Sequence, residues 1–369
     1  MRVLHCVPSM AGGGAERQLS YLARELVRAG CDVHVAVIQG GPNLKRLEAS
    51  GATVHRIRAI GNHDPLILAQ LLRTIRMIQP DVVQCWLLQM EVAGGIAATV
   101  SGTPWIFSER AAAEAYRPGF KTWLRVKVAS WSTAIVSNSS TGDRYWRTRV
   151  SGSVARYVIP NGLPLDEIAA APAAVLDHAD LTPGQPLILA AGRFEREKNI
   201  DTLVRAVRLV GETRSVQALL CGDGSLQGGV ARLIHEQGLA GRVRLAGYVG
   251  NLWSLLKRAD VFVAPSVFEG SPNAVLEAMA CRCPLVVSDI PAHRELLDDE
   301  TAVFVNPVGP RRLADAIVAV LSDPAAAAER ARRAEARAQR FSLQAVARTY
   351  EDVYRDVSTR ERVIRTFAS

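Results

Sequence analysis

Two segments in the second half of the chain carry charged residues in loops that lead from an apolar run into a predicted helix. In the first segment, Gly192 and Arg193 follow the apolar run and Lys198 comes five residues after the arginine. Arginine offers a planar fork of donors that suits phosphate, and lysine adds a point charge. Two cations beside a helix N-terminus suit a diphosphate leaving group, because they stabilise the negative charge that grows as its bond breaks. The alternative is a surface turn with solvated charges.

The second segment, residues 268–277, contains two glutamates with seven residues between them. Glu269 lies in a loop after a predicted strand, and Glu277 lies in the helix that follows. Pro272 suits the first turn of that helix, whose free N–H groups face any ligand at its start. A carboxylate in the loop can accept hydrogen bonds from sugar hydroxyls, and one on the helix can accept them from a ribose diol. The alternative for Glu269 is an acid that favours the helix dipole by ~0.3–1 kcal/mol.

A glycine-rich loop, residues 11–17, follows the first predicted strand and runs straight into a helix. Gly13 and Gly14 allow close approach of a ligand to the backbone and leave helix N–H groups free for a phosphate or sugar. A dinucleotide-binding fingerprint needs glycine or alanine where Arg17 stands, so NAD binding is disfavoured. A tight turn without a ligand is the alternative.

The bulk composition indicates a globular protein of two domains. The chain has 369 residues, of which 49% are hydrophobic and 22% charged, and a domain typically takes about 150–200 of them. Apolar runs are too short to span a membrane, and the apolar start of the chain predicts a first strand and not a signal peptide. The six cysteines lack metal-ligand spacing, so we expect reduced thiols, no metal site and a cytoplasmic location.

Positive charge is concentrated in residues 110–156. This window carries +7 of the net charge of +8. Such an excess predicts an anionic partner, either a phosphate-bearing substrate or a membrane surface on which the protein would be peripheral; a solvated face without a partner is the alternative. No motif typical of nucleic-acid binding accompanies the charge, so a nucleic-acid partner is not expected. The basic residues of the window are Arg110, Arg117, Lys121, Arg125, Lys127, Arg144, Arg147, Arg149 and Arg156.

Short apolar runs alternate with amphipathic helical patterns along the whole chain. Strands that are apolar on both faces and alternate with helices predict parallel sheets covered on each side, here in two doubly wound α/β domains. The expected strands of the first half are Val3–Val7, Val33–Ile38, Val54–Arg58, Val82–Cys85, Trp105–Ser108 and Ala134–Ser137. Those of the second half are Leu187–Ala190, Val216–Cys221, Val243–Ala246, Val261–Ala264, Pro284–Val287 and Ala302–Val305.

The predicted domain boundary lies in residues 159–186, which are dense in proline and glycine. We expect an acceptor-side domain over residues 1–165 and a donor-binding domain over 166–342. Asp323 and Pro324 suit the start of a helix, and Ser342 can cap a last one. We expect residues 343–369 to form that last helix and to pack back toward the N-terminal domain.

Taken together, these segments resemble glycosyltransferase family 4, a retaining family with the GT-B fold. Gly192-Arg193 with Lys198-Asn199 matches the family pattern G-R-x-x-x-x-K-N, and Glu269 and Glu277 match its paired glutamates. The resemblance covers nearly the whole chain. Lesser matches are residues 13–17, Pro160-Asn161-Gly162, Gly222-Asp223-Gly224, Gly247 and residues 259–266.

The resemblance implies two Rossmann-like domains that face a cleft and a nucleotide-sugar donor, a UDP- or GDP-sugar, with no obligatory cofactor or metal. Absence of an Asp-x-Asp motif agrees with this. By the resemblance Arg193 and Lys198 hold the diphosphate, Glu277 holds the ribose and Glu269 holds the transferred sugar, so that Glu269, Arg193 and Lys198 are the catalytic set. The implied donor site comprises Gly13, Gly14, Gly192, Arg193, Lys198, Tyr248, Val249, Glu269, Gly270, Ser271, Pro272, Asn273 and Glu277.

The acceptor side is less specified. Many members of the family carry a histidine after the strand that corresponds to Trp105–Ser108, whereas this chain has Glu109 and Arg110, which become candidates for the acceptor side. Residues 120–131 form a helical stripe of aromatic and aliphatic residues with lysines and an arginine interleaved. We expect this stripe to face the core, and the alternative is an amphipathic element that rests on anionic lipid.

The predicted function is therefore that of a retaining, metal-independent glycosyltransferase of the hexosyltransferase type. It would use a nucleotide-diphosphate-sugar and an acceptor hydroxyl, with a glycan or lipid-linked acceptor as in assembly of surface polysaccharide or lipopolysaccharide. A GT-B-like epimerase would act on the nucleotide sugar without an acceptor. A non-catalytic nucleotide-sugar-binding subunit would bind UDP or GDP without turnover.

Overall fold

The computed structural model consists of two compact units, each with its own sheet and core. Unit 1 comprises residues 1–162 and 341–369, and unit 2 comprises residues 163–340. The structure describes residues 1–61, 64–112, 114, 116, 118–174, 182 and 184–368, with side chains described up to residue 359. Arg117 of the basic window, and residues 175–181 and 183 of the predicted linker, lie outside the described residues. Among the described residues, no helix combines the length and the apolar character that crossing a bilayer requires.

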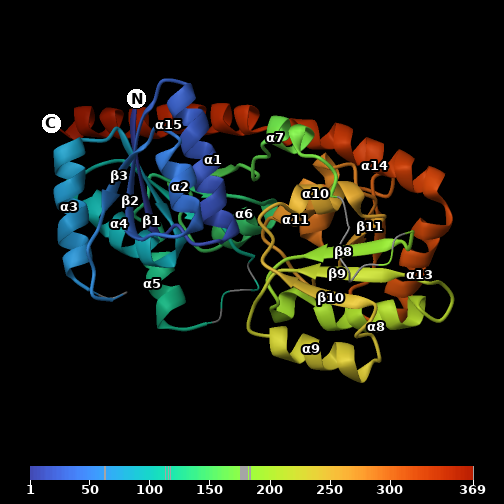
Figure 1. Cartoon of the computed structure of the whole chain (residues 1–369). Helices are drawn as coiled ribbons and strands as arrows, with labels where there is room; N and C mark the ends of the chain where they lie inside the picture. Colours follow the sequence, from blue (N-terminus) through green and yellow to red (C-terminus); the bar gives the residue numbers. More distant parts are fainter. Residues whose placement is uncertain are drawn as a thin grey trace. The chain divides into compact units, whose positions relative to one another are not determined.

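Unit 1 is built on a parallel seven-stranded sheet with the order β3-β2-β1-β4-β5-β6-β7 (Figure 1). The order reverses between β1 and β4, which lie side by side with Val3 opposite Val82. Its strands are β1 (Arg2–Ser9), β2 (Asp32–Gln39), β3 (Thr53–Arg56), β4 (Val82–Trp86), β5 (Trp105–Glu109), β6 (Ala134–Ser137) and β7 (Ala155–Val158).

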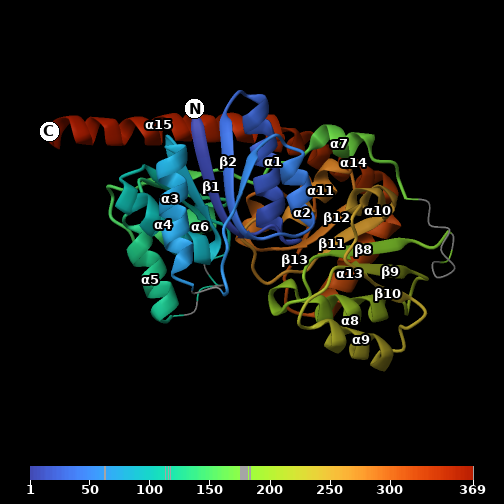
Figure 2. The same ribbon diagram turned by 60° about the vertical axis from the view of Figure 1, so that its left-hand side comes forward.

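Helices cover both faces of this sheet, because the strands are apolar on both sides. One core lies between the sheet and helices α1, α2 and α15, and the other lies between the sheet and α3 to α6 (Figure 2). Side chains of β1 alternate between the two cores: Val3 and Val7 belong to the first, Leu4 and Cys6 to the second. The helices are α1 (Gly14–Arg28), α2 (Pro42–Glu48), α3 (Leu66–Ile78), α4 (Leu87–Ser101), α5 (Phe120–Ala129), α6 (Ser140–Arg147) and α15 (Leu343–Ala368).

Unit 2 repeats the topology with a parallel six-stranded sheet of order β10-β9-β8-β11-β12-β13. Its main core lies between this sheet and helices α8, α9 and α13. The strands are β8 (Leu187–Ala191), β9 (Gln217–Cys221), β10 (Val243–Gly247), β11 (Val261–Ala264), β12 (Leu285–Ser288) and β13 (Val303–Val305). The helices are α7 (Leu165–Ala170), α8 (Ile200–Val210), α9 (Gln227–Glu236), α10 (Leu252–Arg258), α11 (Asn273–Ala280), α12 (Pro291–Arg294), α13 (Pro310–Ser322) and α14 (Pro324–Ala338), with short 3₁₀ turns at Arg196–Lys198 and Gln339–Phe341.

Two parallel, doubly wound sheets confirm the predicted fold class. The strand β7 was not predicted, because this edge strand has three half-buried residues and an exposed one and lacks a continuous apolar run. The predicted start of α14 is also found, since the Asp323 carboxylate accepts a hydrogen bond from Ala326 N (3.0 Å) with Pro324 following it. The last helix, α15, packs on α1 within unit 1.

Candidate functional site

The predicted donor loops of unit 2 follow the two strands between which the strand order reverses. Strands β8 and β11 are neighbours, and the loops after them carry Lys198 and Glu269 respectively. In an open parallel sheet, the crevice for a ligand forms at the carboxyl ends of such a pair, because the following helices lie on opposite faces. Topology therefore brings together two residues that are 71 positions apart in the sequence.

Lys198 and Glu269 form an ion pair through Nζ and Oε1. The same carboxylate oxygen accepts a hydrogen bond from Ser266 Oγ (2.7 Å). Burial alone would raise the pKa of Glu269, but the Lys198 ammonium and the Ser266 hydroxyl outweigh it and hold the pKa below its usual value. Glu269 is therefore ionised at neutral pH. The pair borders a small cavity of about 20 Å³, which Pro272 also lines.

The Asn199 side chain fixes the end of the loop that carries Lys198. The backbone of Asn199 has a positive φ of 53°, a conformation in which asparagine is tolerated better than most residues. Its amide Nδ2 donates to Pro265 O (3.1 Å) and to Pro307 O (2.9 Å), in the loops after β11 and β13. Its Oδ1 accepts from Thr202 Oγ1 (2.7 Å) at the start of α8. The amide thus ties three loops together and sets the position of the preceding lysine.

Glycines allow the loop after β8 to pack directly on the loop after β9. A Cβ atom on Gly222 would lie 1.9 Å from the carbonyl oxygen of Gly192, which leaves no room for any other residue type. Gly222 has a φ of 129°. Phe194 N donates to Asp223 O (2.7 Å), which closes this backbone contact. Gly192, a predicted site residue, thus lies in a tightly packed stretch of backbone beside Lys198.

The other predicted donor residues are less closely gathered. The Arg193 side chain is 74% exposed and its guanidinium pairs with Glu197 (3.3 Å). Glu277 is buried in α11, and Tyr248, just past β10, is 63% exposed. Val249, Gly270, Ser271 and Asn273 are half-buried, and Pro272 is buried at the start of α11. Sequence reasoning did not single out Ser266, which lies three residues before Glu269 and donates to it.

In unit 1, the predicted glycines form the N-terminal end of α1. Gly13 is its N-cap and Gly14 its first residue. Glu16 folds back over this turn, so that a Cβ atom on Gly13 would lie 2.3 Å from the Glu16 carboxylate. The Ser9 hydroxyl, at the end of β1, donates to the same carboxylate (3.1 Å). The end of the Glu16 side chain thus fills the space beside Gly13, and a larger residue at this position would make the flexible carboxylate shift.

Glu109, a candidate for the acceptor side, is fully buried and engaged in a network of hydrogen bonds. Its Oε2 accepts from Trp146 Nε1 (2.6 Å) and Arg125 (3.2 Å), and its Oε1 accepts from Tyr116 (2.5 Å) and Ala111 N (2.8 Å). Arg125, expected on a basic surface, is in fact buried between the two carboxylates of Glu91 and Glu109. This network fastens the loop after β5 to the sheet, so the position of Glu109 supports a structural role.

Arg110, the other acceptor-side candidate, is turned into unit 1. Its guanidinium stacks over the Trp86 ring (4.2 Å to the centroid). It donates to Tyr350 of α15 and to Asn161 Oδ1 (3.3 Å). Arg110 thereby joins the end of β5 to the C-terminal helix and to the segment that leaves the unit.

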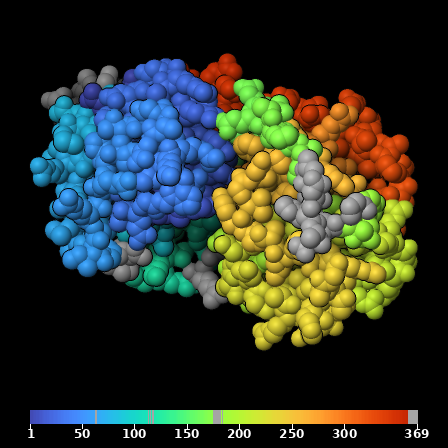
Figure 3. All heavy atoms as spheres, in the orientation of Figure 1, coloured from blue at the N-terminus to red at the C-terminus, as the bar shows by residue number. Residues whose placement is uncertain are grey.

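The helical stripe of α5 faces the core only in part: Val128 is buried and Leu124 packs against the core, as predicted, whereas the aromatic residues are exposed. Phe120 and Trp123 are 72% and 55% exposed, and their rings stack with centroids 5.7 Å apart. Lys121 and Lys127 are exposed, whereas Val128 and Arg125 are buried. The core-facing side of the helix therefore includes the arginine, and the exposed side carries aromatic rings between lysines. In the space-filling view, α5 (teal) reaches the surface of unit 1 (Figure 3).

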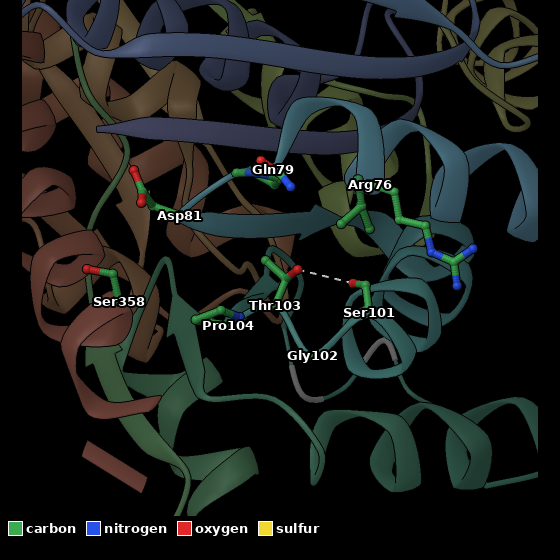
Figure 4. A pocket seen from close by; sticks show the side chains of 10 residues that line it. Arg76, Gln79, Asp81, Ser101, Gly102, Thr103, Pro104 and Ser358 are labelled. Carbon is green, nitrogen blue, oxygen red and sulfur yellow. Dashed lines mark hydrogen bonds between the residues drawn. The ribbon is translucent and has the colours of Figure 1, made fainter. Parts of the chain in front are cut away.

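A cavity of about 450 Å³ lies in unit 1 at the edge of the sheet opposite to the one that carries Glu109 and Arg110. Asp81 and Pro104, which line it, directly precede β4 and β5, so the cavity is at the amino ends of these strands. Figure 4 shows Gln79, Thr103 and Ser358 around the same basin. None of the predicted site residues lines it.

Two family models match the chain and together cover most of it. The model described as "Glycosyl transferase 4-like domain" matches residues 13–162, and the model described as "Glycosyl transferases group 1" matches residues 185–323. The first match lies in unit 1 and the second in unit 2. The second contains Lys198, Glu269 and Glu277.

Several curated proteins and solved structures are similar. The lipopolysaccharide core biosynthesis glycosyltransferase LpsD of Rhizobium meliloti is 28% identical over 96% of this chain and 98% of the relative. The N-acetylgalactosamine-N,N'-diacetylbacillosaminyl-diphospho-undecaprenol 4-alpha-N-acetylgalactosaminyltransferase of Campylobacter jejuni is 30% identical over 46% of each chain. The chain spans half the length or less of several such relatives. HepE of Anabaena, crystallised with UDP and glucose, matches with a TM-score of 0.85 at 20% identity, over 96% of this chain and 100% of HepE.

Replacing Asn199 by aspartate should lower the free energy of unfolding by about 3 kcal/mol, since it removes two donors and sets a carboxylate against two carbonyl oxygens. Urea denaturation measures this change. The matched control is Asn251→Asp, in which the oxygen that caps α10 is kept. Equal stability of the two variants would contradict the role of Asn199 in tying the three loops together.

Glu91 should make the stability of the protein fall as the pH rises from about 4.5 to about 7. Burial raises its pKa from 4.5 to about 7, even though Arg125 opposes the shift. Between these values the folded state binds the proton more tightly than the unfolded state, so raising the pH costs up to about 3 kcal/mol. Glu91→Gln should remove this dependence in denaturation curves, and Glu48→Gln, at an exposed glutamate, should keep it. An unchanged slope in Glu91→Gln would refute the assignment.

Proposed function

This chain belongs to glycosyltransferase family 4 and has the GT-B fold, and we propose that it moves a sugar from a nucleotide-diphosphate-sugar to an acceptor hydroxyl with retention of configuration. The observation that carries the proposal is the ion pair of Lys198 and Glu269 at the carboxyl ends of β8 and β11. HepE, of similar fold, was crystallised with UDP and glucose, which supports a UDP-sugar as the first donor to test. A GDP-sugar is the second.

In the proposed donor complex, Lys198 leaves Glu269 in part and binds the diphosphate, and the freed carboxylate accepts hydrogen bonds from the sugar hydroxyls. Arg193, which is exposed at the start of the same loop, reaches the diphosphate by turning from Glu197. Glu277 holds the ribose, and Tyr248 with Val249 borders the base. A lysine and a carboxylate that neutralise each other before binding keep both charges compatible with a half-buried site.

The proposed reaction breaks the bond between the anomeric carbon and the phosphate oxygen and forms one from that carbon to the acceptor oxygen. The acceptor proton passes to the departing phosphate oxygen, on the same face of the sugar. Lys198 and Arg193 stabilise the charge that develops on the diphosphate, which is greater in the transition state than in the bound donor. The chemistry needs no metal ion in this scheme.

For the acceptor, we propose a lipid-linked glycan reached at an anionic membrane surface. Two similar proteins are named for lipopolysaccharide core biosynthesis and for transfer to a diphospho-undecaprenol-linked sugar. The exposed side of α5 supports this, because stacked aromatic rings between lysines suit the interface of an anionic bilayer. The protein would then be cytoplasmic and peripheral on the inner face of the cell membrane.

The donor site predicts a selective thermal shift. A UDP- or GDP-sugar at ~100 times its dissociation constant should stabilise the folded protein by ~2.7 kcal/mol. Lys198→Ala and Glu277→Ala should each abolish the shift, whereas Lys257→Ala, a lysine that bonds carbonyl oxygens near α7, should keep it. A full shift in both site variants would discard the assigned site. Release of free nucleotide or an epimer without any acceptor would instead favour an epimerase.

The membrane proposal predicts flotation with liposomes that contain anionic lipid and not with neutral ones. Phe120→Ser with Trp123→Ser should reduce the bound fraction by about tenfold, because two interfacial aromatic rings are lost. Trp131→Ser is the matched control, since this tryptophan is 53% exposed but lies beyond the end of α5. Binding that is lost equally in all variants, or that is absent in the wild type, would remove the proposal.

A further inference from the structure

A buried histidine lies behind the carboxylate that we assign to the donor sugar. His293 is in α12, which follows β12, and its side chain is fully buried. In the sheet, β12 lies between β11 and β13. The helix that follows β12 and carries His293 therefore lies at the same carboxyl edge of the sheet as Glu269. The sequence alone does not distinguish it from an ordinary core histidine.

Hydrogen bonds connect this histidine to Glu269 through two serines. His293 Nδ1 donates to Ser288 O (2.8 Å), which fixes the tautomer because a carbonyl oxygen only accepts. Ser288 Oγ lies 3.3 Å from the same nitrogen and donates to Ser266 O (2.5 Å). Ser266 Oγ in turn donates to Glu269 Oε1 (2.7 Å). These hydrogen bonds, joined through the covalent frames of Ser288 and Ser266, link the imidazole to the carboxylate.

The imidazole also senses the charges of the ion pair. His293 Nε2 is buried and has no hydrogen-bond partner among the described residues. Burial lowers the pKa of His293, and the charges of Glu269 and Lys198 act on it in opposite directions. The ring is therefore neutral and close enough to both members of the ion pair to sense them. An unsatisfied buried acceptor costs about 1–3 kcal/mol, so an ordinary core position would favour an apolar residue instead.

We propose that His293 is a positioning residue for donor-sugar binding, which holds the Glu269 carboxylate in place through Ser288 and Ser266. The inference rests on the proposed function. Because the chain ends at Glu269, assigned to the sugar, and reaches the diphosphate only through the Lys198 partner of that carboxylate, loss of His293 weakens binding of the sugar more than binding of the nucleotide. A merely structural histidine would affect both or neither.

The test compares binding of UDP-glucose and of UDP by titration calorimetry, or of GDP-mannose and GDP if the wild type prefers guanine. His293→Phe, which fills the space without the hydrogen bond, should weaken the nucleotide sugar by about tenfold and the nucleotide by less than about twofold. His293→Asn should restore most of the affinity, since its amide can donate to Ser288 O. Equal losses for sugar nucleotide and nucleotide, or no loss, would overturn the proposal.

Ser266→Ala provides the matched variant within the chain of hydrogen bonds. It should reproduce the effect of His293→Phe, and the double variant should be no weaker than either single one, because both act on one carboxylate. Additive losses would mean that His293 acts by another route and would contradict the proposal.

A measurement without ligand separates this inference from the proposed function. The acid titration of Glu269 can be followed by carboxyl ¹³C shifts, assigned with Glu269→Gln. Its midpoint should rise in His293→Phe and in Ser266→Ala and return in His293→Asn, because the Ser266 hydroxyl stabilises the anion. An unchanged midpoint in His293→Phe would overturn the positioning role. If the wild type binds neither UDP- nor GDP-sugars, the donor assignment fails and this titration alone decides the role of His293.

Discussion

The ion pair of Lys198 and Glu269 is the interaction on which the organisation of unit 2 depends. Removing two charges from water is costly unless each is paired and hydrogen-bonded. The structure meets this cost with the Ser266 hydroxyl on the carboxylate and with the Asn199 amide, which fixes the loop of the lysine. Both strands that lead into the pair, β8 and β11, are buried and adjacent. The pairing of these two strands therefore holds the loops that follow them side by side at the carboxyl edge of the sheet.

The fold could be predicted from the sequence because strands buried on both faces leave continuous apolar runs. Ala134–Ser137 and Val261–Ala264 have the predicted bounds, since flanking turn residues mark them clearly. The edge strand β7 could not be predicted, because an edge strand packs on one side only and its Arg156 and Tyr157 read as surface. Arg125 shows a second limit. A charge is read as exposed unless its partners are known, and here they are 34 and 16 residues away.

The candidate site was predictable to the level of its loops, but not to the level of its side-chain contacts. Lys198 and Glu269 stand out because the family pattern names them and because each lies in a loop that leads from an apolar run into a helix. Their mutual contact depends on which strands are neighbours, and that follows from topology and not from spacing. Asn199 belongs to the family pattern and Ser266 to the lesser match over residues 259–266, but neither match says what the side chain contacts, and His293 carries no signal of its own. Their roles appear only when the partner loops are in place.

The two units share one topology but differ in what holds the charged residues at the carboxyl ends of their strands. In unit 2 the charged residues at the carboxyl edge border a cavity. In unit 1 the charged residues at the end of β5 are bound by partners within the unit: Glu109 by Arg125, and Arg110 by Tyr350 and Asn161. A carboxylate whose two oxygens each accept two hydrogen bonds is a poor base, because protonation would break them. With Glu109 so engaged, the proposed transfer is better served if the departing phosphate itself takes the acceptor proton. On this view unit 1 contributes the binding of the acceptor, and unit 2 the electrostatics of the reaction.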